Sequence, residues 1–336
     1  MKFDSTKKQA IISYILEKID EDAESVSLRV AETFGISQNT VHTYLRELLD
    51  NNIIKRGKRG KYELVSEQYE YVLNRESGEL DDDMFVYSKC LLPHISTLPD
   101  NVKQIWQYAV SEMTNNVIDH SGAKQLSVTI KTDHLKTEVY LDDNGIGIFN
   151  KIKEHFGFSE IDDAICELFK GKITTDAANH SGEGVFFTSR IMDKFWIVSS
   201  GKVFSSSKFD NDEVVNQIDL PGTCVYMALS NSSHKSMSEI FNLYSNLDGG
   251  FTRTSIPLRL VFDSAPVSRS QAKRITYRLD DFKEVELDFK DIDWMGQGFA
   301  HQLFVLYAKA HPDTKLIPVN MEKGVSEMYE HVIAEM

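Results

Sequence analysis

The chain has 336 residues, a formal net charge of −14, 41% hydrophobic residues and 26% charged residues. These values are typical of globular proteins with two or three domains, and they argue against a chain that coats nucleic acid along its whole length. No apolar stretch approaches the roughly 20 residues that span a bilayer, and the N-terminus lacks the apolar core of a secretory signal. The cysteines Cys90, Cys166 and Cys224 are widely spaced without a CxxC pair, so we expect a cytoplasmic protein without disulfides or a zinc site.

Residues 1–65 predict a small helical head that ends in a basic hairpin. Apolar residues recur at helical spacing over residues 7–19. Ser27 is the expected N-cap of a short helix that ends at Phe34, and Ser37 that of a second helix, Gln38–Leu49. The stretch IIKRGKRGKYEL then predicts a strand, a glycine-rich basic tip and a returning strand. This order resembles the winged helix-turn-helix family.

The resemblance implies a DNA-binding domain, in which the second helix enters the major groove. The expected base-reading residues are Gln38, Asn39, Thr40, His42, Thr43 and Arg46. The expected phosphate contacts in the wing are Lys55, Arg56, Lys58, Arg59 and Lys61. Residues 1–65 hold 11 basic and 10 acidic residues, so a winged domain used for protein contact remains the alternative. Five cations within seven residues favour DNA.

Residues 66–84 are acidic and predict a connecting helix that frays into a linker. Another helical segment is expected from Phe85 to Leu98. His94 lies where a histidine kinase could carry its phosphoaccepting histidine. The flanking prolines and the absence of a two-helix dimerisation hairpin argue against that role.

Three motifs between Glu112 and Gly184 point to one bound nucleotide. EMTNN places Glu112 and Asn116 four residues apart, on one face of an amphipathic helix. The alternating strand Leu135–Leu141 leads into DDNGIGI, which supplies Asp143 and two glycines. Gly182 and Gly184 open a further apolar helix, whose N-terminus suits a phosphate.

This order of motifs resembles the GHKL ATPase superfamily, and within it the anti-sigma-factor serine kinases, over roughly residues 85–232. The implied fold is an α/β sandwich with helices on one face of a mixed or antiparallel sheet, and the implied cofactors are ATP and Mg²⁺. Glu112 would orient or deprotonate the attacking group, Asn116 would ligate Mg²⁺, and Asp143 would accept a hydrogen bond from adenine. The remaining nucleotide-binding residues that the resemblance implies are Asp119, Gly145, Gly147, Ser181, Gly182, Glu183, Gly184, Val185 and Thr223.

Simpler interpretations compete with each of these roles. Glu112 and Asn116 could form a solvated stripe, and Asp143–Gly147 a mere turn. His120 matches a family position, although a histidine after a helix more often caps or packs. Glu183 stands where the kinase branch often has a basic residue. The long connection Phe149–Asn179 is expected to be a lid with a helix over Ile161–Lys170.

Residues 233–336 alternate strand and helix patterns and predict a small parallel or mixed sheet with helices outside. The stretches SRSQAKRI, LDFKDIDWMGQGFAHQLF and PVN resemble STAS-like domains. In STAS anti-anti-sigma domains a phosphorylatable serine precedes a helix; here the turn Met295–Gly298 has no hydroxyl. Ser268 and Ser270 are weaker acceptor candidates, because helix capping explains a serine there.

The expected fold class is therefore multidomain α+β, with a winged head (1–65), a linker (66–84), a GHKL-like centre (85–232) and a STAS-like tail (233–336). We expect a regulator in which the nucleotide state of the centre controls DNA or partner binding. The alternatives are a serine/threonine protein kinase that acts on a separate partner, and an ATPase module with a protein-binding head. The tail could bind a protein partner. Homodimerisation would fit paired DNA half-sites.

Overall fold

The computed structural model describes residues 5–21, 24–173, 182–206, 221–246, 250–262 and 264–334. The α-helices in these ranges are α1 (Ser5–Asp20), α2 (Val26–Phe34), α3 (Gln38–Asp50), α4 (Asp83–Val86), α5 (Leu92–Ile95), α6 (Asp100–Asn115), α7 (Ile148–Phe156), α8 (Ile161–Lys170), α9 (Gly184–Ile191), α10 (Met237–Tyr244), α11 (Leu258–Val261), α12 (Arg269–Thr276), α13 (Gln297–Ala300), α14 (Ala308–Ala310) and α15 (Lys323–Ala334). The strands are β1 (Ile54–Arg56), β2 (Tyr62–Leu64), β3 (Glu67–Asn74), β4 (Gln125–Thr132), β5 (Lys136–Asp143), β6 (Lys194–Ser199), β7 (Lys202–Ser205), β8 (Thr223–Ser230), β9 (Ser245–Asn246), β10 (Gly250–Phe251), β11 (Arg253–Pro257), β12 (Glu284–Asp288) and β13 (Lys315–Val319).

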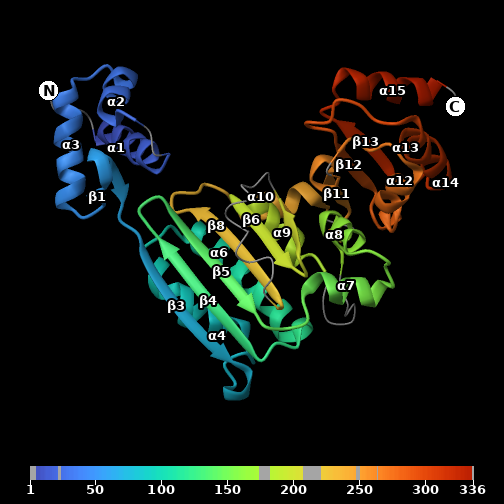
Figure 1. The fold of residues 1–336 in the computed structure, drawn as a ribbon, viewed down its shortest axis with the longest axis horizontal. Helices are drawn as coiled ribbons and strands as arrows, with labels where there is room; N and C mark the ends of the chain where they lie inside the picture. Colours follow the sequence, from blue (N-terminus) through green and yellow to red (C-terminus); the bar gives the residue numbers. More distant parts are fainter. Residues whose placement is uncertain are drawn as a thin grey trace.

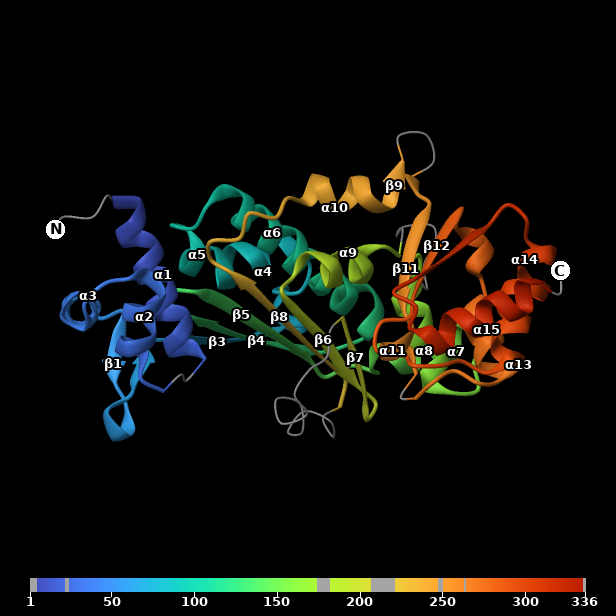
Figure 2. The ribbon, with the colours of Figure 1, turned by 90° about the horizontal axis from the view of Figure 1, so that it is seen from above.

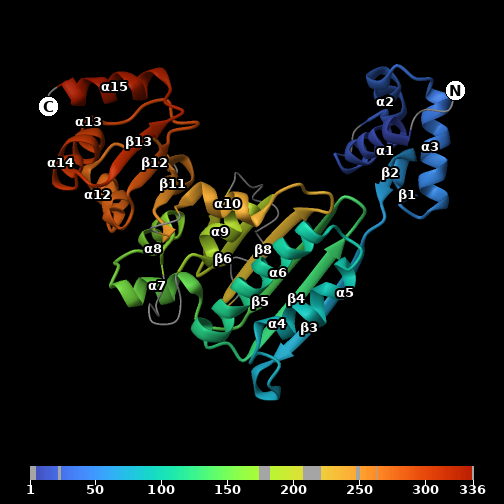
Figure 3. The same ribbon diagram turned by 180° about the vertical axis from the view of Figure 1, so that it is seen from behind.

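The protein has a mixed α+β fold with several sheets (Figure 1). Its centre is a six-stranded sheet of described strands in the order β3-β4-β5-β8-β6-β7, and every neighbouring pair is antiparallel. The helices α4, α5, α6 and α9 lie on one face of this sheet (Figures 2 and 3). The head and the tail lie at opposite ends of the molecule. Helices on one face of an antiparallel sheet are the arrangement that the sequence predicted for the centre.

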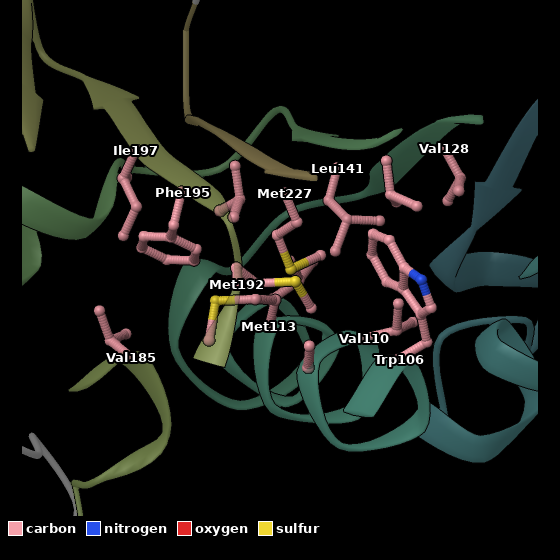
Figure 4. Packing of buried hydrophobic residues seen from close by; sticks show 14 of the residues in the cluster. Trp106, Val110, Met113, Val128, Leu141, Val185, Met192, Phe195, Ile197 and Met227 are labelled. Carbon is pink, nitrogen blue, oxygen red and sulfur yellow. The ribbon is translucent and has the colours of Figure 1, made fainter. Parts of the chain in front are cut away.

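Helix α6 anchors the central core. Trp106, Val110 and Met113 point from α6 toward the sheet, where they meet Leu141 of β5 and Met227 of β8 (Figure 4). All five side chains are at most 2% exposed. Burial of such residues at about 25 cal/mol per Å² of apolar surface is the main stabilising contribution to this layer. The amphipathic character predicted for this helix is confirmed.

The head contains α1, α2, α3 and the hairpin β1–β2, around its own apolar core. Ser37 caps α3 as predicted, since its hydroxyl accepts a hydrogen bond from the Thr40 N–H at 3.2 Å. The predicted cap Ser27 is wrong: α2 begins at Val26, and Ser25 occupies the N-cap position with φ 56°. Ser25 makes no side-chain capping bond there.

The acidic segment 66–84 does not form the predicted helix. Residues Glu67–Asn74 are β3, which pairs with β4 along its whole length. Tyr69, Tyr71 and Leu73 alternate along this strand and pack on the central core. This alternation of core-facing and exposed side chains is typical of a strand, whereas the acidic composition had favoured a solvated helix.

The tail contains a three-stranded parallel sheet in the order β11-β12-β13, in the part of the chain that the structure describes. The predicted alternation of strands and helices is confirmed. The apolar stretch IPLRLVF is not one continuous strand, because β11 ends at Pro257 and Leu258–Val261 form the short helix α11. Among the described residues, no helix combines the length and the apolar character needed to cross a membrane.

A buried lysine joins the centre to the tail. Lys170, at the end of α8, is 1% exposed and pairs with Glu167 one turn earlier. The Lys170 Nζ also donates to the carbonyl oxygens of Arg274 at 3.0 Å and Tyr277 at 2.7 Å, at the C-terminal end of α12. A cation is stabilised there by the helix dipole and by carbonyls that lack partners within the helix.

We predict that Lys170→Met lowers the free energy of unfolding by about 3–5 kcal/mol, the usual cost of breaking a buried ion pair. The substitution leaves Glu167 with the Arg278 guanidinium 3.9 Å away and removes the donor for two carbonyls. Urea denaturation measures the change. Lys323→Met is the control, because Lys323 and Glu327 form an exposed pair worth about 0–1 kcal/mol. Equal effects of the two substitutions would contradict the assignment.

Candidate functional site

A cavity of about 260 Å³ opens between α6, the end of β5, α7, α8 and α9. Its wall combines polar groups from α6 and β5 with apolar side chains from α7, α8 and the sheet. The lining residues are Glu112, Met113, Asn115, Asn116, Val117, His120, Ser121, Asp143, Gly147, Ile148, Lys151, Ile152, Leu168, Ile173, Gly182, Gly184, Val185, Ile197, Thr223 and Val225. A concave site that combines apolar side chains with convergent polar groups is typical of small-molecule binding.

Asp143 supplies a carboxylate to this cavity from the end of β5. It is 6% exposed and lies directly across from Thr223 in the β5–β8 register. Its Oδ1 accepts a hydrogen bond from the Gly145 N–H at 2.7 Å. Burial raises the pKa of Asp143, whereas the hydrogen bonds from Gly145 and Thr223 lower it. A buried acceptor of this kind can select a ligand that donates a hydrogen bond.

Glycines hold the backbone close together around Asp143. A Cβ atom at Gly145 would lie 2.3 Å from the Ser121 carbonyl oxygen, and one at Gly222 would lie 2.0 Å from the Asp143 carbonyl oxygen. Gly147 has φ 85° and precedes α7, whose first N–H, that of Ile148, donates to the Thr223 hydroxyl at 3.0 Å. The loop after β5 therefore packs closely against the start of β8, with little space for side chains.

Helices α6 and α9 form the opposite side of the cavity. Glu112 lies one turn before Asn116, which begins a π-helical turn, Asn116–Ser121. A Cβ atom at Gly184 would lie 2.0 Å from the Glu112 Oε2, so the start of α9 sits directly on this carboxylate. Such π-turns are frequent at functional sites.

The structure brings most of the sequence-predicted nucleotide residues together. Glu112, Asn116, Asp143, Gly147, Gly182, Gly184, Val185 and Thr223 all line the cavity. Among the described residues, Asp119, Gly145 and Glu183 are not in its wall. Asp119 is exposed, and Gly145 supports Asp143 from behind. Ser181 lies outside the described residues.

Glu183, which stands where the kinase branch often has a basic residue, lies close to a lysine and a tyrosine. Burial raises the pKa of its carboxyl, and the charge of Lys172 lowers it. Burial raises the pKa of the half-buried Tyr108, and the charges of Glu112 and Glu183 raise it further. The Glu183 carboxylate therefore interacts electrostatically with Lys172, which follows α8, and with Tyr108 of α6.

Two residues at this candidate site were not predicted from the sequence. Lys151 brings a cation to the cavity from α7, one turn after Gly147. Arg75 braces the π-helical turn from outside: its Nε donates to the Ala123 carbonyl at 2.7 Å, and its Nη2 to those of Val117 and Ile118 at 3.1 Å. Arg75 is the only basic residue of the acidic stretch 66–84, a signal that could have singled it out.

The head presents a second candidate surface on the outer side of α3, which lies far from the centre (Figure 1). Five of the predicted base-reading residues are exposed there, namely Gln38, Asn39, His42, Thr43 and Arg46. Thr40 is half-buried, and its hydroxyl is 2.9 Å from that of Ser37. Its first role is therefore in the helix cap.

The wing carries exposed cations at the turn between β1 and β2. Arg56, Lys58 and Lys61 are exposed, while Lys55 pairs with Glu63 at 3.5 Å. The side chain of Arg59 lies outside what the structure describes. Exposed cations on a short hairpin can contact phosphates.

Comparisons with known proteins address both ends of the chain. Residues 2–75 match the family model described as Firmicute plasmid replication protein (RepL). Residues 271–326 match the model described as STAS-like domain of unknown function (DUF4325), in agreement with the predicted STAS-like tail. Neither match reaches residues 76–270, which contain the cavity. The search of curated proteins gives no match.

We predict that Gly222→Ala destabilises the protein by at least about 2 kcal/mol more than Gly201→Ala. Both glycines have positive φ, which costs a non-glycine residue about 1–2 kcal/mol. A Cβ at Gly222 would also overlap the Asp143 carbonyl, whereas Gly201 has nothing within 4 Å. Thermal or urea denaturation of both variants gives the difference. Equal losses would show that the Asp143 loop is not closely packed.

Proposed function

We propose that this chain is an ATP·Mg²⁺-binding and DNA-binding regulatory protein, in which the nucleotide state of the central domain controls DNA or partner binding. The observation that carries the proposal is the cavity itself. Residues from three separate motifs, dispersed over Glu112–Thr223, converge in one wall. The match of residues 2–75 to plasmid replication proteins supports DNA as the ligand of the head.

The residues present fit an adenine nucleotide. Asp143 is a buried acceptor for an exocyclic amino group, and Ile148, Leu168, Ile197 and Val225 provide apolar walls for a base. Gly184 leaves room beside Glu112 that a Cβ would fill. These features agree with a GHKL-like central domain, which we propose on the three motifs and on the sheet with helices on one face.

The α6 side of the cavity fits the phosphate end. Asn116 would hold Mg²⁺ through its amide oxygen, since Mg²⁺ prefers oxygen ligands and takes several from phosphates and water. The N–H groups at the start of α9 would face the phosphates. Lys151 would add a positive charge in the same cavity. When bound, ATP·Mg²⁺ would supply the negative charge that these groups hold in place.

Direct contacts between the head and the centre support control of DNA binding by the nucleotide. The wing strand β2 and the sheet strand β3 are separated by Val65 and Ser66 alone. Lys136, at the start of β5, lies 3.2 Å from the Asp20 carboxylate of the head. Strand β5 therefore touches the head at one end and carries Asp143 at the other. A nucleotide can shift the head only if it binds two arrangements with different affinity.

We predict that calorimetry with ATP and Mg²⁺ gives a binding isotherm for the wild-type protein. Asp143→Asn should weaken it by about 10- to 150-fold, because a hydrogen bond to a charged group contributes about 1.5–3 kcal/mol. Asn116→Ala should lose the Mg²⁺-dependent part of the affinity. Asp142→Asn is the matched control, because adjacent strand residues face opposite sides of the sheet.

Binding by both site variants with wild-type affinity would reject the assignment of the cavity. Radiolabelled γ-phosphate distinguishes the chemistry that follows binding. Label that stays in intact ATP agrees with a ligand-gated regulator. Label transferred to protein would instead support a serine/threonine kinase in which Glu112, a cavity residue, activates the acceptor hydroxyl.

We predict that Arg56→Ala combined with Lys58→Ala weakens DNA binding and lowers the slope of log K against log salt by about 2, because each phosphate contact contributes about 0.9. Mobility shifts at several salt concentrations measure the slope. The control, Lys290→Ala combined with Lys309→Ala, removes two exposed cations from the tail and should leave the slope unchanged. A slope that is the same in the wing variant and the wild type would remove the wing from the interface.

A further inference from the structure

The strand β11 of the tail contacts α8 and α9, two helices that line the cavity. Thr254 is fully buried, and its hydroxyl donates to the Lys170 carbonyl at the end of α8 at 2.7 Å. The next residue, Ser255, accepts a hydrogen bond through its carbonyl from the Arg190 Nη2 of α9 at 2.6 Å. Two adjacent residues of one strand therefore hold α8 and α9 from behind.

Helix α8 has one side in the cavity and the other against the tail. Leu168 lines the cavity, whereas Lys170 donates to two carbonyls of the tail. Two residues along an α-helix are about 200° apart around its axis, so these side chains point in nearly opposite directions. Any displacement of the tail side of α8 displaces the cavity wall as well.

The contact continues on both sides of this point. Near the start of α8, the Asp163 Oδ1 lies 2.7 Å from the Arg274 Nε of α12. After its end, Lys172 donates to the Asp281 carbonyl at 2.8 Å, next to the cavity residue Ile173. The bonds along α8 thus run from its first turn to the residues that follow it.

Helix α9 is joined to the tail by aromatic packing. Gly184 and Val185 line the cavity, while the rings of Phe186 and Phe187 belong to the apolar core that the tail shares with the centre. The centroid of Phe186 is 4.7 Å from that of Phe251, the last residue of β10. Packed aromatic rings resist relative displacement, because their contacts are lost over a fraction of an ångström.

We infer that the tail positions the nucleotide site, and that Thr254 is a positioning residue for it. The inference rests on the proposed function, since it concerns the same cavity. The Thr254 hydroxyl satisfies a carbonyl at the end of α8 that has no partner within the helix. A partner that moves β11 would therefore change nucleotide affinity, and by reciprocity nucleotide binding would change the tail.

The test compares ATP·Mg²⁺ affinity by calorimetry in full-length variants. Thr254→Val keeps the shape and removes the donor, and we expect at least fivefold weaker binding, the low end of allosteric couplings of about 5- to 150-fold. Thr254→Ser keeps the donor and should bind within twofold of the wild type. Thr314→Val is the matched control. It removes a similar buried hydrogen bond, from the Thr314 hydroxyl to the Phe282 carbonyl at 3.0 Å, and both of these residues belong to the tail.

The outcomes separate the inference from the proposed function. No binding by the wild type overturns both. Wild-type affinity in Thr254→Val, or equal losses in Thr254→Val and Thr314→Val, overturns the positioning role and leaves the nucleotide site standing. Should Thr254→Val not fold, as judged by circular dichroism, Arg274→Gln takes its place, because Arg274 is partly exposed and its contact to Asp163 is direct. Affinity unchanged in Arg274→Gln would then overturn the inference.

Discussion

The pairing of β5 with β8 is the constraint on which the rest of the molecule depends. Its register sets Asp143 opposite Thr223, and the adjacent Gly222 approaches Asp143 so closely that a side chain would not fit. A shift of one residue would turn Asp143 to the other face of the sheet, and would separate it from Glu112 of α6 and from Asn116 in the π-helical turn. The apolar contacts of α6 with Leu141 and Met227 lie in the same two strands. Core packing and the site are therefore fixed by one register.

The same strands extend to both ends of the molecule. At one end the hairpin between β4 and β5 packs Leu135 against the apolar core of the head, and Lys136 pairs with Asp20. At the other end, α8 and α9 lie between the cavity and the tail. Each of these contacts joins a strand or helix that lines the cavity directly to the head or to the tail. A ligand that favours one arrangement of the cavity would have a direct path to either end, although only differential affinity could drive a change.

The sequence predicted the elements whose signals are local and failed where a partner distant in the sequence decides. The helical period of α6, the cap Ser37 and the glycine motifs are local patterns, and the three motifs, with the resemblance that they carry, were sufficient to predict eight of the residues that line the cavity. Strand β3 was missed because its acidic residues suggested a solvated helix, while its pairing with the distant β4 determines its conformation. Arg75 and Lys151 were missed for the same reason. Arg75 donates to carbonyl oxygens that are distant in the sequence, and Lys151 lines a cavity formed mainly by other segments. The nucleotide itself remains a prediction.

Strand β3 restricts the movement of the head relative to the central sheet. The match to plasmid replication proteins ends at residue 75 and so includes β3 as well as the winged hairpin. In this protein β3 is an edge strand of the central sheet, with eight residues paired to β4. A head attached through a flexible linker could turn independently of the centre, but one that continues into a sheet strand after two residues has little freedom. The orientation of α3, and with it the surface proposed to bind DNA, is therefore tied to the sheet that carries Asp143. If ligand binding in the cavity changes DNA binding by the head, we expect it to act by tilting β3 at the edge of the sheet. The two residues between β2 and β3 are too few to absorb such a motion.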